Sequence, residues 1–412
     1  MEKSVYIVDG LRTPFRKFGT DYKNMSSAYL GAEVVKSLLL KTGIKDTSII
    51  DEITFGCVSQ PADTMNIARY ISMHAGIDKS VPAVSVHRNC ASGMEAITHC
   101  ASKIKAEEGD IYFAGGVENM TQMPFLYNKS AVGKYVKLSK AKKLGDKLFS
   151  LLSFRPSDFA PLIGLKLGLS DTLCDMNMGQ TAELLAREYS ISRSDQDKWA
   201  NESHQKAITN QNLIEEEIIP VYIRNDDCIK SYNGQIITSD NGPRVDSTVV
   251  KLQNLRTVFD RDGSVTAGNS SQLTDGACGL ILMSEEGLKK TGCEPIAEII
   301  EYQYTGCDPS RMGLGPVHAI NKCENSIEEA ELIEINEAFA AQTLAVIKEL
   351  NLDINKINVN GGAIALGHPV GASGARIILT LAKELKRRNL QKGCATLCVG
   401  GGQGGAVWIK AH

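Results

Sequence analysis

Short β-branched runs alternate with longer amphipathic stretches along the first 118 residues of the chain. Apolar runs predict strands over 5–10, 53–58, 83–86 and 110–118. Apolar residues at helical spacing predict helices over 28–43, 65–76 and 92–109, the first of which ends at Gly43. This alternation predicts an α/β fold in which helices cover a sheet.

A piece of this pattern recurs near the C-terminus. The segment "CASGMEAITHCASKI" from Cys90 resembles "GASGARIILTLAKEL" from Gly371. Each is followed by a charged stretch and a strand that ends in glycines, "YFAGGVE" (112–118) and "LCVGGGQ" (397–403). Any two strand–helix–strand units look alike to some degree, but the aligned Ala, Ser, Gly and later Gly-Gly favour a duplicated α/β unit.

A loop-rich segment separates the two halves. We predict three parts: an N-terminal half made of 1–118 with 264–283, an inserted loop domain at 119–263, and a C-terminal half at 284–412. Within the insert, 129–155 has eight Lys or Arg residues and one acid, Asp146, with apolar residues at helical spacing. Such a basic amphipathic helix can contact a membrane, a partner subunit or a polyanion. A solvated helix packed on its own domain is an equal alternative.

Composition excludes some classes of function. The formal net charge of −3 gives no support for a nucleic-acid partner. No apolar run is long enough for a membrane span, and the N-terminus lacks the pattern of a signal peptide. The 11 cysteines include no CxxC pair, which argues against a zinc site and predicts a cytoplasmic protein without structural disulfides. We expect no bound metal.

Cys90 is a candidate nucleophile. It lies between an apolar run and a predicted helix, and small residues follow it. A helix N-terminus stabilises a thiolate, so we expect a lowered pKa for this thiol. In a chain with 11 cysteines, a structural role is the alternative.

Three further motifs carry polar groups in glycine-rich or apolar surroundings. His368 lies in "NVNGGAIALGHPVGASGAR" (358–376), where the glycines let the backbone approach a ligand closely. Asn336 in "EINEAFAAQ" either caps a helix or orients a water or a carbonyl oxygen. Cys398 in "CATLCVGGGQGGA" could transfer protons beside glycine N–H groups that form an oxyanion hole, or it is a buried strand cysteine before a tight turn.

Together these motifs resemble those of the thiolase family over essentially the whole chain. The matching segments are "VDGLRTPFRKFG" (8–19), "NCASGMEA" (89–96), "GGVENM" (115–120), "NMGQTAE" (177–183), "GSVTAGNSSQLTDGA" (263–277), "NEAFA" (336–340), "GGAIALGHPVGASGAR" (361–376) and "CVGGGQGG" (398–405). The resemblance implies two duplicated five-stranded α/β halves in a five-layer core, with a loop domain inserted in the first half. It also implies reversible Claisen condensation of acetyl-CoA, or thiolysis of 3-ketoacyl-CoA, in a homodimer or homotetramer.

The resemblance assigns a role to each candidate. Cys90 would be the acylated nucleophile, His368 its activating base, and Cys398 the acid/base for the α-proton of the second acetyl-CoA. Asn336 would position a water at the thioester oxygen, and the N–H groups of Cys90 and Gly400 would bind the acyl-enzyme oxyanion. CoA and acyl-CoA are substrates, and no further cofactor is implied. Residues implied to contact CoA are Met178, Arg244, Phe259, Ala267, Ser271 and Phe339.

Chain-length preference stays open at this point. Asn177 stands where biosynthetic thiolases of this kind commonly have His, and 138–165 resembles the longer insert of degradative thiolases in trifunctional β-oxidation complexes. In contrast, "HRNCASGM" resembles the short-chain branch. The rival hypotheses are a longer-chain degradative thiolase, a 3-ketoacyl synthase acting on carrier-protein thioesters, and a catalytically silent scaffold that binds acyl-CoA.

Overall fold

A single mixed sheet runs through the protein. The structure, a computed structural model, describes residues 3–224 and 232–412. The strand order is β14-β15-β16-β13-β1-β12-β5-β3-β4, and β2 pairs with β12. The strands are β1 (Tyr6–Arg12), β2 (Arg16–Lys17), β3 (Glu52–Gly56), β4 (Ala83–Val86), β5 (Ile111–Glu118), β12 (Thr274–Met283), β13 (Ala297–Gly306), β14 (Leu332–Ile335), β15 (Lys392–Val399) and β16 (Gln403–Ala411).

The sheet consists of two halves with the same internal order. In the first, β4, β3 and β5 are parallel, and β12 and β1 continue antiparallel. In the second, β14 and β15 are parallel, and β16 and β13 continue antiparallel. A parallel bridge from Ile333 to Ile357 stands where β4 stands in the first half. The halves meet where β1 pairs with β13 at Tyr6–Glu298 and Ile7–Ala297, so the predicted duplication is confirmed.

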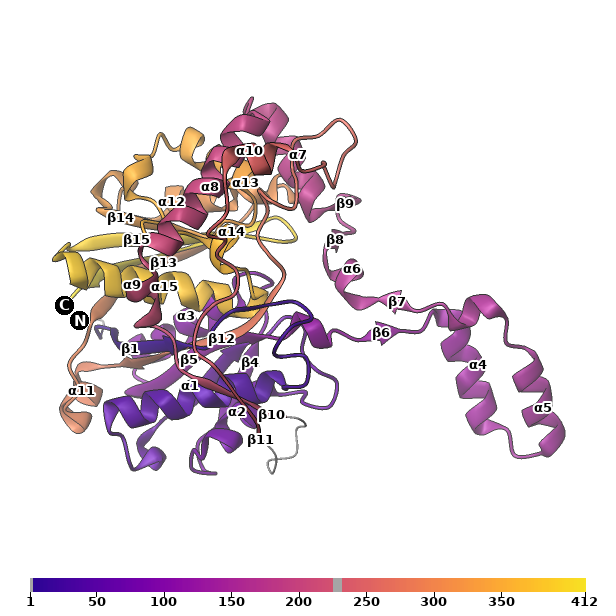
Figure 1. The fold of residues 1–412 in the computed structure, drawn as a ribbon. Helices are drawn as coiled ribbons and strands as arrows, with labels where there is room; N and C mark the ends of the chain where they lie inside the picture. The colour runs from indigo at the N-terminus through magenta and orange to yellow at the C-terminus, as the bar shows by residue number, and fades with distance from the viewer. Residues whose placement is uncertain (1–2, 225–231) are drawn as a thin grey trace.

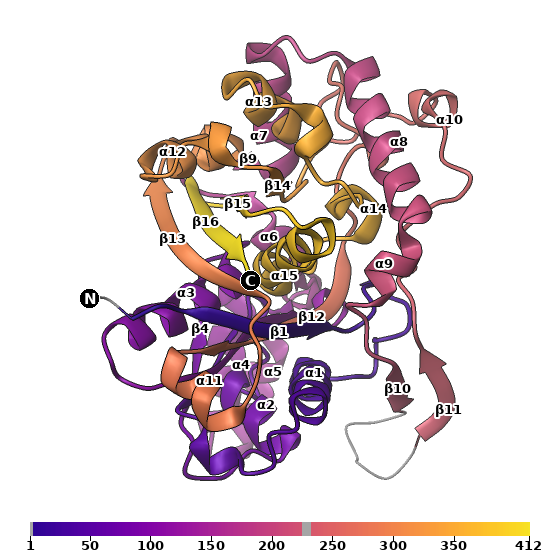
Figure 2. The same ribbon diagram turned by 90° about the vertical axis from the view of Figure 1, so that its left-hand side faces the viewer.

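Helices separate and cover the two halves in five layers (Figures 1 and 2). The helices α3 (Ser92–Lys105) and α15 (Val370–Arg388) pack against each other between the halves. On the outer faces lie α1 (Ser27–Thr42) and α2 (Ile67–Ala75) of the first half, and α12 (Gly315–Lys322) and α13 (Ala340–Glu349) of the second. The central core cluster takes apolar residues from α3, α15 and both halves of the sheet, such as Ile97, Leu280, Ile378 and Leu397.

Local sequence explains the ends of the predicted helices. Ser26 caps α1, where its side chain accepts from the N–H of Tyr29, and Gly43 ends that helix with a left-handed φ of 72°. The helix predicted at 92–109 is α3 and ends earlier, at Lys105, with basic residues in its last turn. The helices α1 and α3 of the first half therefore fold as the pattern predicts.

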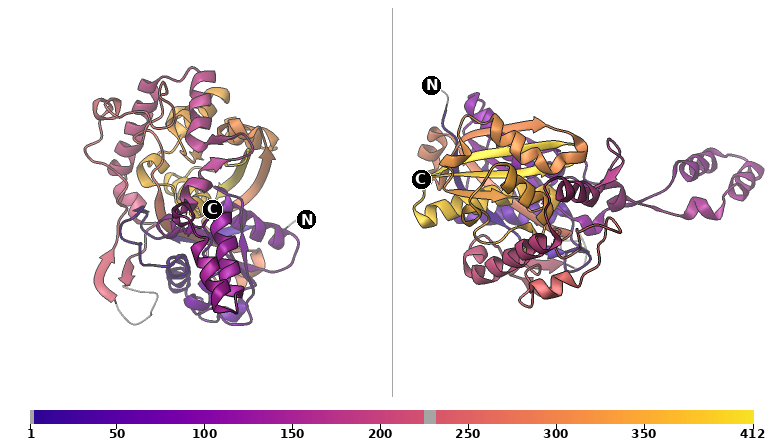
Figure 3. Two further views of the ribbon diagram at one scale, coloured as in Figure 1. Left: turned by 90° about the vertical axis from the view of Figure 1, so that its right-hand side faces the viewer. Right: turned by 90° about the horizontal axis from the view of Figure 1, so that it is seen from above.

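The segment 129–155 differs from its prediction. It forms two helices, α4 (Lys129–Lys140) and α5 (Leu144–Leu152), instead of one. The chain reverses at 141–143, and the two helices pack side by side as a hairpin. The short strands β6 (Phe125–Leu126) and β7 (Leu162–Ile163) pair beneath it, and the hairpin extends away from the body of the molecule (Figures 1 and 3). Because little protein surrounds it, its apolar side chains stay exposed.

The remaining elements connect these layers and cover the site. They are α6 (Gly164–Gly168), β8 (Ser170–Asp171), β9 (Met176–Asn177), α7 (Met178–Glu188), α8 (Arg193–Thr209), α9 (Gln211–Glu215), β10 (Val221–Arg224), β11 (Tyr232–Ile237), α10 (Val249–Gln253), α11 (Glu285–Thr291), α14 (Ala363–Leu366) and six 3₁₀ turns at Thr47–Ile49, Met120–Gln122, Pro156–Phe159, Pro309–Leu314, Ile327–Glu329 and Ile354–Lys356. Among the described residues, none of the helices combines the length and apolar character that a membrane crossing requires.

Candidate active site

Cys90 lies in a tight turn that feeds α3. The N-cap of α3 is Ala91, so Cys90 directly precedes the helix. Asn89 has a φ of 42°, in the left-handed region. The Ser92 hydroxyl accepts from the Arg88 N–H at 2.9 Å and donates to the Asn89 carbonyl at 2.7 Å. These bonds hold the turn in one shape and present the Cys90 side chain at its tip.

Two backbone N–H groups point at the Cys90 sulfur. One belongs to Gly400 and the other to Cys90 itself, and both lower the pKa of the thiol. Burial has the larger effect, however, and raises the pKa above its ordinary value. The expected lowering by the helix N-terminus is therefore wrong in its net sign, because desolvation of the thiolate outweighs it. The paired N–H groups have the arrangement of an oxyanion hole.

His368 is held as a neutral imidazole on the loop between α14 and α15. The backbone N–H of His368 donates to the Gln272 carbonyl at 3.1 Å, and its ring Nδ1 lies 2.6 Å from the Ser373 hydroxyl. Ser373 donates its proton to the Pro369 carbonyl at 3.1 Å, so Nδ1 is the donor in its bond to Ser373 and Nε2 is left as an acceptor. Burial, with a contribution from Arg376, lowers the pKa of His368 to about 4. The ring is therefore suited to accept a proton on Nε2.

Asn336 presents a buried amide that the protein leaves unpaired. Its backbone N–H donates to the Thr396 carbonyl at 3.0 Å, which fixes it beside β15. Neither polar atom of its side chain has a hydrogen-bond partner among the described residues. The N-cap of α13 is Phe339, so the capping alternative for Asn336 is wrong. Because a buried amide without a partner costs free energy, this side chain is suited to bind a ligand or a water.

Cys398 lies at the end of β15, almost fully buried. Burial raises the pKa of its thiol well above the ordinary value, and the neighbouring Cys90 raises it further. The turn that follows contains Gly401 and Gly402, whose φ values of 90° and 77° suit glycine. The two cysteines thus lie within electrostatic range of each other, and the glycine turn directly follows Cys398.

Three of the residues implied to contact CoA gather beside Cys398. Met178, Phe259 and Phe339 belong to its apolar cluster, and the two phenylalanine rings meet edge to face at 5.9 Å. Ser271 joins this group through its N–H, which donates to the Ala338 carbonyl at 3.0 Å.

The other two implied CoA contacts are not members of that apolar cluster. Ala267 and Arg244 are exposed. The Arg244 N–H donates to His204 Nδ1 at 3.2 Å. Within residues 3–224 and 232–412, no group of three His, Cys, Asp or Glu side chains is arranged to hold a metal ion.

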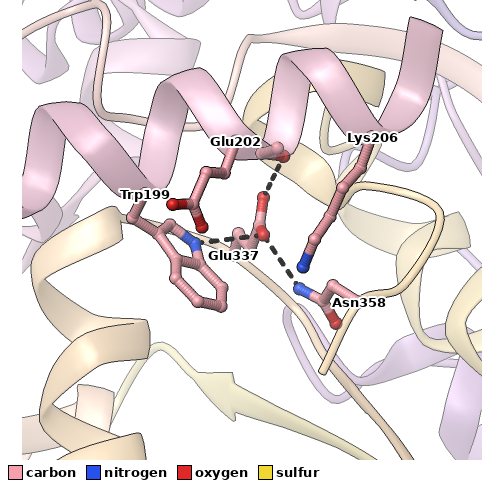
Figure 4. Close-up of a pocket in the computed structure, with 6 residues that line it drawn as sticks. Trp199, Glu202, Lys206, Glu337 and Asn358 are labelled. Atoms are coloured by element: carbon pink, nitrogen blue, oxygen red, sulfur yellow. Dashed lines mark hydrogen bonds between the residues drawn. The ribbon is translucent and has the colours of Figure 1, made fainter. Parts of the chain in front are cut away.

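Glu337 lies at the centre of a buried hydrogen-bond network (Figure 4). Its carboxylate accepts from Trp199 Nε1 at 3.1 Å and Asn358 Nδ2 at 2.9 Å on one oxygen. The other oxygen accepts from the Ser203 hydroxyl at 2.8 Å and the Ile364 N–H at 3.1 Å. This one buried side chain therefore joins α8, the loop after β14 and the segment that leads to His368.

Sequence reasoning assigned no role to several residues that shape the site. Glu118 accepts from the N–H groups of Ser59 and Gly371 at 2.8 and 2.9 Å, which fixes the start of α15 against the first half. Its signal was its place in the "GGVENM" motif. Ser373 had a weaker signal, its position five residues after His368 in a predicted helix start.

Comparisons with known proteins agree with this geometry. The family models described as thiolase, N-terminal domain and thiolase, C-terminal domain match residues 5–286 and 293–411. The chain is 39% identical over 420 residues to a protein from Syntrophomonas wolfei named acetyl-CoA acetyltransferase, with 100% of both chains covered. The structure of acetyl-CoA acetyltransferase from Bacillus anthracis has a TM-score of 0.89 at 37% identity, with 100% of this chain and 99% of that one covered. Human mitochondrial 3-ketoacyl-CoA thiolase in complex with CoA has a TM-score of 0.87 at 35% identity, with 100% of this chain and 98% of that one covered. The chain therefore belongs to the thiolase family.

Proposed function

We propose that this acyltransferase condenses two molecules of acetyl-CoA to acetoacetyl-CoA and CoA, and in reverse cleaves 3-ketoacyl-CoA with CoA. The observation that carries the proposal is the position of the Cys90 sulfur, which faces the N–H groups of Cys90 and Gly400 with Cys398 nearby. The names of the relatives from Syntrophomonas wolfei and Bacillus anthracis support the same reaction.

In the first half-reaction Cys90 is acylated. The Sγ proton of Cys90 passes to Nε2 of His368, and the sulfur attacks the thioester carbonyl. The bond between that carbonyl carbon and the CoA sulfur breaks, and the departing CoA thiolate takes the proton from His368. The neutral, Ser373-oriented imidazole supports this role, since it has an acceptor nitrogen at physiological pH.

Oxygen-binding groups stabilise the charge that develops in each half-reaction. The N–H groups of Cys90 and Gly400 bind the oxyanion on the acyl-Cys90 carbonyl. One such donor lowers the activation free energy by about 3–4 kcal/mol. The unpaired amide of Asn336 positions a water that, with His368, binds the thioester oxygen of the substrate. Buried donors act strongly here because they need little reorganisation.

In the second half-reaction Cys398 acts as a base. Its thiolate removes an α-proton from the second acetyl-CoA, and the resulting carbanion attacks the acyl carbon on Cys90. The bond between the acyl carbon and the Cys90 sulfur breaks, and the departing Cys90 thiolate takes the proton from the Cys398 thiol, which restores the Cys398 thiolate. An acylated Cys90 cannot ionise, so a Cys90 thiolate cannot raise the pKa of Cys398 in this half-reaction.

The apolar cluster beside Cys398 is the proposed binding site for the pantetheine part of CoA. We assign Met178, Phe259 and Phe339 to contact with pantetheine, together with Ser271. Ala267 borders the same segment, and the exposed guanidinium of Arg244 suits the phosphates or adenine of CoA. These assignments rest on the family resemblance and on the placement of the residues.

The hairpin α4–α5 is the feature that favours a longer-chain, complex-associated thiolase as the second candidate. Leu144, Leu148 and Phe149 on α5 are 84%, 58% and 78% exposed, and 129–155 also carries eight Lys or Arg residues. We propose that this hairpin contacts an anionic membrane or a partner subunit. Retention on phosphatidylglycerol vesicles, lost in Leu148→Asp/Phe149→Asp, would support a membrane. Absence of binding would leave a partner subunit as the surviving proposal.

The proposed organisation and setting complete this hypothesis. We propose the division into 1–118 with 264–283, 119–263 and 284–412, supported by the pairing of β12 with β1 and β5. We further propose a homodimer or homotetramer in the cytoplasm. The ten cysteines within the described residues are all free thiols, which supports a reducing compartment.

The decisive experiment measures thiolysis by purified protein across a series of substrates, from acetoacetyl-CoA to long-chain 3-ketoacyl-CoA. Activity confined to acetoacetyl-CoA means an acetyl-CoA acetyltransferase. Activity that rises with chain length means a degradative thiolase of fatty-acid oxidation. A chain that binds acyl-CoA without thiolysis at any length would overturn the proposal in favour of a silent scaffold. Activity only with carrier-protein thioesters would favour a 3-ketoacyl synthase.

A further inference from the structure

Asn89 stands immediately before the nucleophile in a conformation that most side chains avoid. Its φ of 42° lies in the left-handed region, which Asn tolerates better than other residues with a Cβ. Such backbone conformations persist only where the surrounding structure holds them, and they gather at functional sites. Four hydrogen bonds made by Ser92 and Ala91 with the backbone of Arg88 and Asn89 close the turn around Asn89.

The Asn89 side chain reaches across the seam between the two halves. Its Nδ2 donates to the Gly400 carbonyl at 2.7 Å, over a sequence separation of 311 residues. Gly400, Gly401 and Gly402 have no side chains with which to fix their own conformation. The far end of this turn is held by the N–H of Cys307, which donates to the Gly402 carbonyl at 2.7 Å. Asn89 holds the near end at Gly400, whose backbone N–H faces the Cys90 sulfur.

Arg88 makes a parallel contact that strengthens the seam. Its guanidinium donates to Gln403 Oε1 at 3.2 Å, lies 4.2 Å from the centroid of the Tyr304 ring and pairs with Glu95 at 2.6 Å. Arg88 therefore holds the strand after the glycine turn, while Asn89 holds the turn itself. The two residues that precede the nucleophile both bind the half that supplies the oxyanion donor.

We propose that Asn89 is a positioning residue that holds the Gly400 turn so that the Gly400 N–H meets the oxyanion formed when Cys90 is acylated. This inference rests on the proposed thiolase chemistry. Without the amide, the glycine turn samples other conformations and the donor is misplaced when charge develops. Displacement of a catalytic group by about 1 Å costs on the order of 100-fold in rate.

The proposed role of Asn89 predicts different effects on two reactions of the Cys90 sulfur. Acyl transfer from acetyl-CoA builds an oxyanion and needs the Gly400 donor. Alkylation by iodoacetamide displaces iodide from carbon and builds none. A residue that positions the oxyanion donor affects the first reaction and spares the second, whereas a residue that merely maintains the fold affects both.

The test uses Asn89→Gly and Asn89→Asp in the full-length protein. Glycine keeps the left-handed backbone and removes the amide, and aspartate keeps the shape but replaces the donor with a carboxylate. We expect kcat for thiolysis and the rate of Cys90 acylation by acetyl-CoA to fall about 10- to 100-fold in both variants. The KM for CoA and the rate of Cys90 alkylation by iodoacetamide should stay within about twofold of the original protein.

Asn351→Gly is the matched control, because Asn351 is also left-handed, with a φ of 49°, but is exposed and far from Cys90 in the sequence. It should leave both reactions unchanged. Normal acylation in Asn89→Gly would overturn the inference, and so would equal losses of acylation and alkylation. If the unsubstituted protein forms no acyl-Cys90, the proposed function itself fails and the role of Asn89 falls with it.

Discussion

At the scale of single residues, the two cysteines of the site are protonated thiols at neutral pH. Burial raises the pKa of both, and the interaction with Cys90 raises that of Cys398 further. Neither sulfur is a ready-made thiolate, so each needs a base or a change in its surroundings before it reacts. This makes His368 and the order of the two half-reactions central to the chemistry.

Cys90→Ser should abolish turnover and acyl-enzyme formation. A serine hydroxyl is a far weaker acid than a thiol, and a neutral imidazole cannot activate it to the same degree. Mass spectrometry of the intact protein after incubation with acetyl-CoA should show an added acetyl group in the original protein and none in the variant. Normal thiolysis by Cys90→Ser would contradict its role as the nucleophile.

Cys398→Ser should separate the two half-reactions. The variant keeps Cys90, His368 and the Gly400 N–H, so it should still form the acetyl-enzyme. It should fail in condensation, because no thiolate is available to remove the α-proton. Rapid quenching after mixing with acetyl-CoA measures both products. Condensation at the normal rate would mean that Cys398 is structural.

The buried histidines should make the protein sensitive to mild acid. Burial lowers the pKa of His204 to about 4, with contributions from Arg244 and Lys17, and the ordinary value is 6.5. Between these pH values His204 is protonated in the unfolded chain but neutral in the folded protein. The free energy of unfolding therefore falls as pH drops from about 6.5 toward 4. His204→Asn keeps an acceptor for the Arg244 N–H and removes this titration. Urea unfolding should therefore show a smaller loss between pH 7 and pH 5 in the variant, and an equal loss would refute this account.

Residue chemistry explains which parts of the site could be read from the sequence. Cys90, His368 and Cys398 stand out because each lies among small residues in a motif that resembles the thiolase family. Asn89 does not stand out, since its role depends on a left-handed φ and on a carbonyl from the other half. The net rise in the pKa of Cys90 was also out of reach, because burial of a thiol follows from packing.

At the scale of elements, Glu337 joins α8 to the loops that carry Asn336 and His368. Glu337→Gln should destabilise the protein by about 1–3 kcal/mol, because an amide nitrogen would face donors such as the Ile364 N–H. It should also lower kcat, since the loops lose their common anchor. Denaturant unfolding and steady-state thiolysis measure the two effects. Glu202→Gln, on the same face of α8 (Figure 4), is the control and should change neither.

The hairpin α4–α5 should be dispensable for folding. Its apolar side chains are exposed and it stands clear of the two halves (Figure 1), so its removal costs little buried area. A variant in which a short Gly-Ser linker replaces 129–155 should keep its thermal midpoint and its activity on acetoacetyl-CoA. Loss of the folded state would show that the hairpin packs on the core.

Periodicity predicted the main strands and helices of residues 1–118 but could not place the reversal inside 129–155. Apolar residues continue at helical spacing through 141–143, so the pattern resembles one helix. The strands of the first half were easier to predict, because β-branched runs bounded by glycines and charged turns indicate a strand. Pairing across the seam, as between β1 and β13, has no local signal.

At the scale of the whole molecule, the site lies where two similar halves meet. One half contributes Cys90 at the start of α3, and the other contributes His368 at the start of α15 and Cys398 at the end of β15. The internal repeat in the sequence predicted the duplication correctly. It could not predict that α3 and α15 pack together. This packing brings the turn before α3, which contains Cys90, close to the glycine-rich loop before α15, which contains His368.

The separation of Asn89 and Gly400 by 311 residues has a consequence for synthesis on the ribosome. Cys90 emerges from the exit tunnel long before the glycine turn that completes its oxyanion hole is translated. The growing chain therefore contains Cys90 before it contains the Gly400 N–H that the proposed mechanism requires. On that mechanism, a product that terminates before Gly400 is inert.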